Sequence, residues 1–350
     1  MAVESPVQRS AATATFPYAL LRAGYPYYTT LGMRRVTTAA ADVAIGGEGR
    51  LYVICRDDGQ GGLIRRTNWD DEDLGTISGA GTDPGKLMWP VQLILDSQET
   101  LWVSDEGTHR ISNFNRDGEL LGTWGEAGNA PGQLNRPSGI AWDLDGNMLV
   151  VDTQNHRVQK FTKGGQYISS FGERGSGPGQ FEMPWGIAVD MLGDVYIGDW
   201  GNDRIQKLTA DGEPVWSTGR SGGGDGELRR PAGVAVDAHG DVYVADRGNH
   251  RVCLFDKTGR YVEKFIGDAT ISKSGRQYIL ANPKVLRGRE MTTLEIQKRL
   301  RGPMSVRVDG DLLYIPDFGS HRIQVYKKEA YVLTEADIWP EQNHPFLYNV

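Results

Sequence analysis

The stretch Pro137-Ser-Gly-Ile-Ala-Trp-Asp-Leu-Asp-Gly-Asn-Met-Leu-Val-Val-Asp-Thr-Gln-Asn-His-Arg-Val-Gln-Lys-Phe161 recurs with variations along most of the chain. Equivalent segments begin at Pro90, Pro184, Pro231 and Pro303, and three consecutive steps between them are each 47 residues. A period of about 40 to 50 residues, filled with short β-branched and aromatic runs between Gly, Asp and Asn, is typical of propeller blades. The spacing therefore predicts a β-propeller.

Each copy divides into four short runs suited to β-strands. In the quoted copy these are Gly-Ile-Ala-Trp-Asp, Met-Leu-Val-Val-Asp, Arg-Val-Gln-Lys-Phe and, after a Lys-Gly-Gly turn, Tyr-Ile-Ser-Ser-Phe-Gly. Turn residues bound every run, as expected for antiparallel hairpins. A sixth, degenerate copy starts at Ala40, because Leu51-Tyr-Val53 matches Leu101-Trp-Val103. We therefore predict an all-β fold, a six-bladed β-propeller with four antiparallel strands per blade.

The segments outside the repeats are rich in aromatic residues and proline. Residues 1–39 form an arm that we expect to supply a strand closing the ring, residues 40–335 form the propeller, and residues 336–350 form a tail. The arm contains Phe16-Pro-Tyr18, and the tail contains Trp339-Pro and Pro345-Phe-Leu-Tyr348. Such segments pack either on their own chain or at an interface, so a protein partner or a homo-oligomer stays an open alternative.

Composition limits the other classes of function. The 350 residues carry a formal net charge of −7, which argues against general nucleic-acid binding. Neither a signal peptide nor an apolar run of membrane-spanning length is apparent, so we expect no membrane and a cytoplasmic location. Cys55 and Cys253 fall in different copies and give no disulfide framework.

The regular spacing breaks between the fifth and sixth copies, where the step grows from 47 to 72 residues. Thr292–Leu300 in this inserted region, 268–302, has a hydroxyl start, an early Glu and late cations, which predict a short helix. The insertion joins two blades, so we expect it to fold as a lid over the central opening; a plug or an oligomer contact is the alternative. Its basic residues are Lys273, Arg276, Lys284, Arg287, Arg289, Lys298, Arg299 and Arg301.

Two recurring residue types are interpreted as architecture rather than as a site. An Asp at the end of the second run and an Arg five residues later occur in five copies, which indicates a repeated ion pair. A His precedes that Arg in four copies, but equivalent positions around a ring should not converge on one metal. We expect no metal at these residues. The pairs are Asp105/Arg110, Asp152/Arg157, Asp199/Arg204, Asp246/Arg251 and Asp317/Arg322, and the histidines are His109, His156, His250 and His321.

The residue directly after that Asp varies strongly between copies. It enters the loop between the second and third strands, on the face where one blade connects to the next. Two arginines, a carboxylate and two large aromatics at equivalent places around an opening favour recognition of an anionic or aromatic ligand, although ordinary solvated loop residues would look the same. In ring order these residues are Arg56, Glu106, Thr153, Trp200, Arg247 and Phe318.

The innermost runs also depart from the template. Blades three to five carry Gly139, Gly186 and Gly233 where the other blades have Asp42, Gln92 and Ser305. Arg307 stands where the template has Ala. We expect Asp42, Gln92 and Arg307 to line the channel and bind substrate, and a structural calcium ion is compatible with these groups.

The pattern Pro-x-Gly-Ile/Val-Ala-Val-Asp, followed by Val-Tyr-Val-x-Asp-x-x-Asn-x-Arg-Ile/Val-Gln-x-Phe, resembles the NHL repeat over residues 40 to 335. The resemblance implies a propeller, but NHL proteins include lyases, RNA-binding propellers, sensors and scaffolds.

Among NHL enzymes, the peptidyl-hydroxyglycine amidating lyases are the most similar. Arg56 in Ile-Cys-Arg-Asp-Asp-Gly and Arg247 in Ala-Asp-Arg-Gly-Asn-His-Arg look like arginines of that group. The resemblance fails at the zinc-binding histidines and the catalytic Tyr, so we do not expect a zinc-dependent lyase or another cofactor. The histidine positions are occupied by Ala41, Val91, Ser138, Trp185, Ala232 and Met304, and the Tyr positions by Gly107, Gln154, Gly201, Gly248 and Gly319.

These observations lead to one preferred function and two alternatives. We expect an anionic or aromatic small molecule, or a peptide end, to bind at the mouth through Trp200, Phe318 and Thr153. If the protein is an enzyme, a metal-independent lyase or hydrolase, Glu106 is the acid or base candidate and Arg56 and Arg247 orient the substrate. The alternatives are a non-catalytic scaffold that uses the same face or the aromatic termini, and, third, an RNA-binding propeller.

Overall fold

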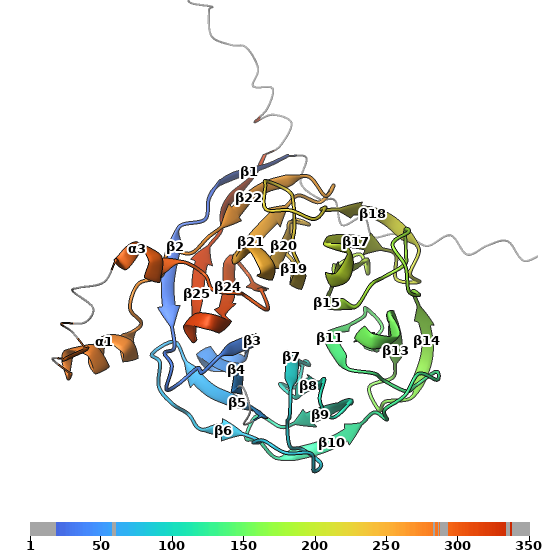
Figure 1. Ribbon diagram of the computed structural model, residues 1–350, viewed down its shortest axis with the longest axis horizontal. Helices are drawn as coiled ribbons and strands as arrows, with labels where there is room; N and C mark the ends of the chain where they lie inside the picture. The colour runs from blue at the N-terminus through green and yellow to red at the C-terminus, as the bar shows by residue number, and fades with distance from the viewer. Residues whose placement is uncertain are drawn as a thin grey trace, which may run out of the picture.

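The computed structural model describes residues 19–57, 61–282, 284, 285, 287, 293–333 and 337. Six four-stranded antiparallel sheets stand around a central axis as the blades of a propeller (Figure 1). The predicted fold class and blade number are confirmed. The segments Phe16–Tyr18 and Trp339–Tyr348, and Arg289 of the insertion, lie outside the described residues.

The strands follow the repeat from the innermost to the outermost position in five blades. Blade one has β3 (Ala40–Ile45), β4 (Arg50–Asp57), β5 (Gly61–Asn68) and β6 (Thr76–Ile77), with the short helix η1 (Gly47–Gly49). Blade two has β7 (Pro90–Leu95), β8 (Leu101–Asp105), β9 (Arg110–Phe114) and β10 (Leu120–Trp124). Blade three has β11 (Pro137–Trp142), β12 (Met148–Asp152), β13 (Arg157–Phe161) and β14 (Tyr167–Phe171). Blade four has β15 (Pro184–Val189), β16 (Val195–Asp199), β17 (Arg204–Leu208) and β18 (Pro214–Thr218). Blade five has β19 (Pro231–Val236), β20 (Val242–Asp246), β21 (Arg251–Phe255) and β22 (Tyr261–Phe265).

Blade six combines both ends of the chain. Its inner strands are β23 (Arg307–Asp309), β24 (Leu312–Asp317) and β25 (Arg322–Lys327), and its outer strand is β2 (Tyr27–Leu31) from the N-terminal arm. Tyr27 pairs with Tyr326 in this sheet. A further ribbon, β1 (Ala19–Gly24) with β26 (Glu329–Leu333), lies outside the ring.

Buried charges attach this ribbon to blade five. The Lys328 ammonium lies 2.5 Å from an Asp237 oxygen and 2.8 Å from Asp241, and the Nε of Arg22 donates to Asp241 at 2.8 Å. Charge-assisted hydrogen bonds of this kind are stronger than neutral ones. The strands β1 and β26 are therefore held against blade five.

The hydrophobic core lies between blades rather than inside one layer. The second strand of blades two to five is buried along its whole length, because it packs on the neighbouring blade on each side. Leu149 and Val151 of β12, for example, share a cluster with Ile187 and Ile197 of blade four. Each blade thus depends on its neighbours for burial.

A buried Asp at the end of the second strand fastens each connecting loop. The Asp152 carboxylate, fully buried, accepts hydrogen bonds from Arg157 Nε at 2.9 Å, Asn155 at 2.8 Å and the Asn135 backbone at 2.6 Å. The same Arg also donates to the Gln133 carbonyl. Blades four, five and six repeat the Asp–Arg pair at 2.8, 2.7 and 3.1 Å.

The predicted pair fails in blade two. Asp105 accepts from the backbone of Met88 and Trp89, but the structure gives no ion pair between Asp105 and Arg110. Arg110 donates instead to the Thr82 carbonyl at 2.9 Å. The expectation of five equal pairs was wrong for this blade, where Ser112 replaces the Gln of the template and the loop is held by backbone donors.

The described part of the insertion includes the helices α1 (Lys273–Leu280) and α3 (Leu294–Lys298). Both lie at the outer edge of the ring beside β2, not above the central opening (Figure 1). Lys273 pairs with Asp70 at 2.7 Å, and Thr270 bonds the Tyr27 hydroxyl at 2.9 Å. The insertion therefore rests against blades one and six instead of covering the mouth. None of the helices among the described residues is long and apolar enough to cross a membrane.

We predict that Arg157→Ala lowers the free energy of unfolding by about 3 kcal/mol, because it leaves a buried carboxylate without its cation. Arg110→Ala is the matched control and should cost about 1 kcal/mol or less, since only one partly exposed hydrogen bond is lost. Urea denaturation of both variants measures the difference. Equal losses would contradict the role given to the Asp–Arg pair.

Candidate functional site

The variable residue after each Asp lies at the start of a tight turn. In blades three to six this residue opens a single helical turn, η2 (Thr153–Asn155), η3 (Trp200–Asn202), η4 (Arg247–Asn249) and η5 (Phe318–Ser320). The next residue has a left-handed backbone, with φ between 53° and 56° at His156, Asp203, His250 and His321. Asn, Asp and His adopt this left-handed conformation more often than β-branched residues do. The six variable residues thus share one face, here called the mouth.

Three of the four recurrent histidines accept hydrogen bonds from the backbone of the neighbouring blade. His109, His156 and His321 each accept a backbone N–H at Nδ1, from Arg136 at 3.1 Å, Met183 at 3.0 Å and Ala39 at 2.8 Å. They join the turn of one blade to the inner strand of the next. Among the residues that the structure describes, no group of three His, Cys, Asp or Glu side chains gathers as a metal site requires.

Glu106 is a counter-charge between two arginines. Its residue is 4% exposed, and its carboxylate lies 2.5 Å from Arg136 and 3.8 Å from Arg56. The Arg56 guanidinium also stacks on Trp89, with 4.9 Å from its central carbon to the ring centre. A carboxylate that lies between two guanidinium groups acts as a hydrogen-bond acceptor. This geometry orients Arg56.

Trp200 forms a second cluster on the mouth. Its ring lies 5.3 Å from that of Trp185, and the guanidinium groups of Arg247 and Arg230 lie 5.4 and 5.9 Å from its centre. Burial, and then the neighbouring charge of Arg230, lower the pKa of Arg247. The pair of arginines gives this part of the mouth a positive charge.

Thr153 and the polar inner-strand residues are held by their own chain. Thr153 is buried, and its hydroxyl bonds that of Ser138 at 2.7 Å. Asp42 accepts from the Ser305 hydroxyl at 2.5 Å and from Arg307 Nε at 2.9 Å. Gln92 accepts from the Ile140 backbone at 3.1 Å. The contacts of Asp42 and Gln92 connect inner strands of different blades, whereas the Thr153 contact lies within blade three. None of these three residues lines the groove of about 720 Å³ described below.

The central channel is constricted where the inner strands begin. The cavity there has a volume of only about 10 Å³ and is lined by residues that include Gln92, Trp185 and Met304. The inner strands of blades three to five approach so closely that a Cβ on Gly186 would lie 2.2 Å from the Ala232 carbonyl oxygen. A second cavity of about 340 Å³ lies toward the other ends of the inner strands and is lined by inner-strand residues of blades two to six, with Arg307 among them. No ligand-sized passage runs through the constricted end of the described propeller.

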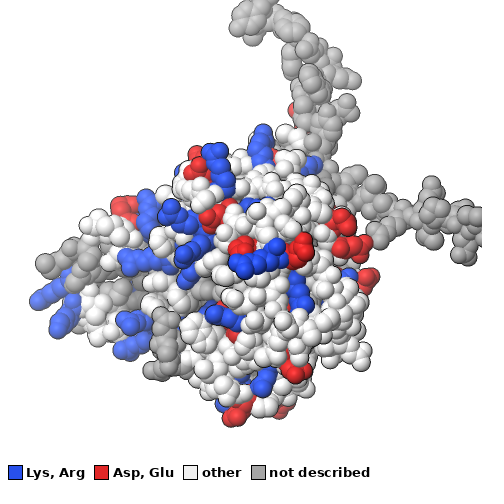
Figure 2. Space-filling view, turned by 45° about the vertical axis from the view of Figure 1, so that its right-hand side comes forward, with Lys and Arg blue, Asp and Glu red and all other residues white. Residues whose placement is uncertain are grey.

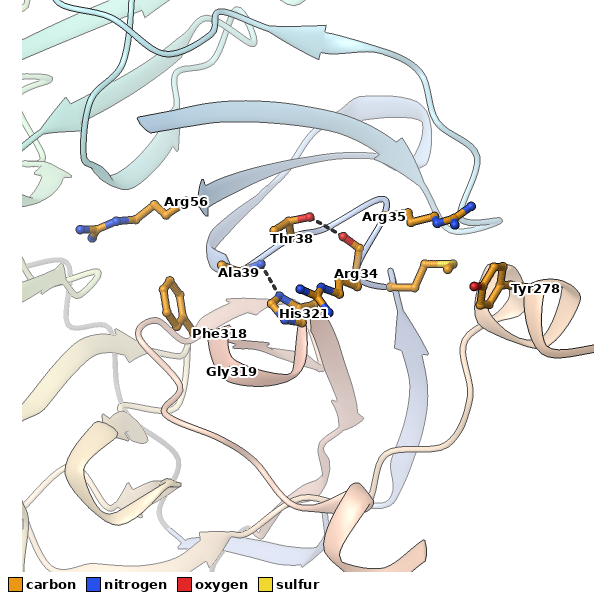
Figure 3. A pocket seen from close by; sticks show the side chains of 10 residues that line it. Arg34, Arg35, Thr38, Ala39, Arg56, Tyr278, Phe318, Gly319 and His321 are labelled. Carbon is orange, nitrogen blue, oxygen red and sulfur yellow. Dashed lines mark hydrogen bonds between the residues drawn. The ribbon is translucent and has the colours of Figure 1, made fainter. Parts of the chain in front are cut away.

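A cavity with a volume of about 720 Å³ opens between blades six and one. Arg56 and Phe318 lie at one end, and Arg35 and Tyr278 at the other (Figure 3). Here we call it the groove. Arg56 and Phe318 were predicted site residues; Glu106, Thr153, Trp200 and Arg247 are not among its lining. The groove residues are Met33, Arg34, Arg35, Thr38, Ala39, Arg56, Tyr278, Phe318, Gly319 and His321.

Three lining residues were missed by sequence reasoning. Arg34 and Arg35 follow the ring-closing strand β2, and Tyr278 belongs to α1 of the insertion. The only sequence feature that could have indicated this site was the pair of arginines at the end of the aromatic N-terminal arm. Figure 2 shows that Lys and Arg dominate the side of the molecule that carries the insertion helices, although the whole chain has a net charge of −7.

Comparison with known proteins supports the fold. The NHL repeat family matches residues 134–161, 181–208 and 228–255, and the chain therefore carries NHL repeats in blades three, four and five. No curated protein sequence matches the chain.

Several solved structures are similar in fold. A streptogramin B lyase has a TM-score of 0.55 at 12% identity, covering 88% of each chain. A virginiamycin B lyase from Staphylococcus aureus, solved with quinupristin, has a TM-score of 0.55 at 12% identity, covering 90% of each chain. A Bacteroides thetaiotaomicron protein of unknown function has a TM-score of 0.57 at 18% identity, covering 84% of this chain and 70% of its own.

We predict that Gly186→Ala destabilises the propeller by about 3 kcal/mol, because the added methyl group forces two inner strands apart. Gly24→Ala, where no atom lies within 4 Å of the new Cβ, should change stability by no more than about 0.5 kcal/mol. Thermal and urea unfolding test this pair. Wild-type stability of Gly186→Ala would mean that the inner strands can separate and the channel can open.

Proposed function

From NHL repeats built into a six-bladed propeller whose channel is constricted where the inner strands begin, we propose that this protein binds an anionic ligand with an apolar or aromatic part, at the mouth end of the groove. One observation carries the proposal. The groove of about 720 Å³ is lined by three arginines and two aromatic rings, and by no Asp or Glu among the described residues. Volumes of about 300 to 1,000 Å³ are usual for small-molecule sites.

Arg56 is the residue that we expect to contact the anion. A guanidinium presents a planar fork of donors that suits a carboxylate or phosphate. Trp89 and Glu106 hold Arg56 from two sides and reduce the entropy that it loses on binding. Phe318 offers an apolar wall beside it. The ligand's charged group would meet Arg56 and its apolar part would meet Phe318.

Any reaction at this site would use the arginines for charge stabilisation. Glu106 is already engaged by two cations, so we assign it the orientation of Arg56 rather than proton transfer. The similar solved structures include lyases, but at 12% identity they support the shared fold alone. A metal-independent lyase or hydrolase reaction that develops negative charge near Arg56 is the enzymatic form of the proposal.

A protein-binding scaffold is the second candidate function. Trp89 is 45% exposed beside Arg56, and exposed Trp next to Arg is common at binding hot spots. In this version the anionic group belongs to a protein partner's acidic side chain or C-terminus. The same arginine would then recognise a macromolecule.

We predict that 3-phenylpropionate, an aromatic monocarboxylate, binds the wild-type protein. Arg56→Ala should weaken this binding about tenfold or more, because the variant loses one hydrogen bond to a charged group. Arg247→Ala is the matched control, because Arg247 has the equivalent place in blade five but does not line the groove. Calorimetric titration of the three folded proteins measures the effect.

Two results would overturn the proposal. One is the absence of heat with the wild type in titrations that reach millimolar ligand. The other is loss of binding in Arg247→Ala with retention in Arg56→Ala, which would move the site to the Trp200 cluster. A thermal melt of each variant shows that it is folded before titration.

A further inference from the structure

The groove continues well beyond the mouth. Figure 3 shows Arg56 and Phe318 at one end, Arg34 and His321 in the middle, and Arg35 and Tyr278 at the far end. A simple monoanion with one ring would occupy only the mouth end of a volume of about 720 Å³. The remaining length needs its own explanation.

Arg34 in the middle of the groove and Arg35 at its far end form a second cationic position. Arg34 and Arg35 lie in the connection between β2 and β3, and no Asp or Glu among the described residues lies within ion-pair distance of either guanidinium. The Arg35 guanidinium stacks on the Tyr278 ring, with 4.9 Å between its central carbon and the ring centre. Arginines that hold no internal counter-ion can bind an external one.

The far wall is anchored. Asp71 is buried and accepts from the Gly32 backbone at 2.7 Å and from the Ser274 hydroxyl at 3.0 Å. One carboxylate thus holds the connection that carries the two arginines and the helix that carries Tyr278. The Lys273–Asp70 pair adds a second, exposed contact. The two sides of the far end are therefore positioned together before a ligand arrives.

Between Arg56 and Arg34 the groove offers few polar groups to a ligand. The Thr38 hydroxyl donates to the Arg34 carbonyl, and His321 Nδ1 accepts from the Ala39 backbone at 2.8 Å. Met33 and Ala39 add apolar surface. A ligand segment that crosses this region gains most by being apolar, because it has no buried donor or acceptor to satisfy.

We propose that the groove recognises an elongated ligand with two anionic groups, one at Arg56 and one at Arg34 and Arg35, joined by an apolar or aromatic segment. The inference rests on the proposed function and adds to it the length and charge pattern of the ligand. Carboxylates and phosphates share the required chemistry. The insertion contributes through Tyr278, as the outer wall of a binding groove.

The test compares straight-chain α,ω-dicarboxylates with alkanoates of the same carbon number, by calorimetric titration of the full chain. We expect an optimum chain length at which the dicarboxylate binds about tenfold more tightly than the alkanoate, since a second charged contact is added. The double variant Arg34→Ala/Arg35→Ala should remove that advantage and leave alkanoate binding within about twofold. A parallel series of α,ω-bisphosphonates decides which anionic group the far end prefers.

Matched controls separate the far end from a general effect of charge. Arg260→Ala removes an equally exposed guanidinium elsewhere on the surface and should leave the dicarboxylate advantage intact. Tyr278→Phe keeps the ring under Arg35 and should therefore also preserve the dicarboxylate advantage. Tyr278→Ala removes the ring and should reduce that advantage. Thermal melts show that each variant is folded.

The outcomes distinguish the two proposals. Alkanoate binding that depends on Arg56, without any dicarboxylate or bisphosphonate advantage, overturns the elongated ligand and leaves the mouth site in place. An advantage that is the same at every chain length, or that survives Arg34→Ala/Arg35→Ala, also overturns it. No binding by any of the three series overturns both.

Discussion

The buried aspartate at the end of the second strand is the interaction on which this propeller depends. In blades three to five, this carboxylate accepts hydrogen bonds from the Asn of the following turn, from the Arg of the third strand and from the backbone of the loop that leads in from the preceding blade. The three residues are Asp152, Asp199 and Asp246. A charge without exposure to water is tolerable only with such a full set of partners. Because these hydrogen bonds fix the conformation of both the turn and the connecting loop, they also determine the position of the variable residue that follows the Asp on the mouth.

The frame was predictable because each blade repeats the same local chemistry. Asp, Gly and Asn mark the turns, and the apolar runs mark the strands, so five good copies determine the sixth. The groove was not predictable in this way. Arg34, Arg35 and Tyr278 lie outside the repeat, and they meet only after the arm has joined blade six and the insertion has packed beside it. The polar inner-strand residues were recognised as exceptions, yet their side chains bond neighbouring strands, as Asp42 does with Arg307.

Charge is distributed unevenly for a chain that is acidic overall. Many carboxylates are placed in turns or ion pairs, such as Asp96 with Lys163 at 2.6 Å, and are locally neutralised. Arginines collect on the mouth and along the groove, around Trp200 and between blades six and one. Net charge alone thus gives little information about the sign of the field at a site. Because the channel is constricted where the inner strands begin, this outer groove of about 720 Å³ offers a ligand space away from the axis.

The pairing of β2 with β25 has a consequence for synthesis of the protein. The ribosome makes β2 before blades one to five and makes its partner β25 after them, so the sixth sheet cannot be completed until those blades have emerged. Until then β2 has no partner strand, and it must avoid pairing elsewhere. The groove forms at this seam, since Arg34 and Arg35 directly follow β2. Ligand recognition is thus coupled to the last event of folding, and an incomplete chain would carry the blades without the site.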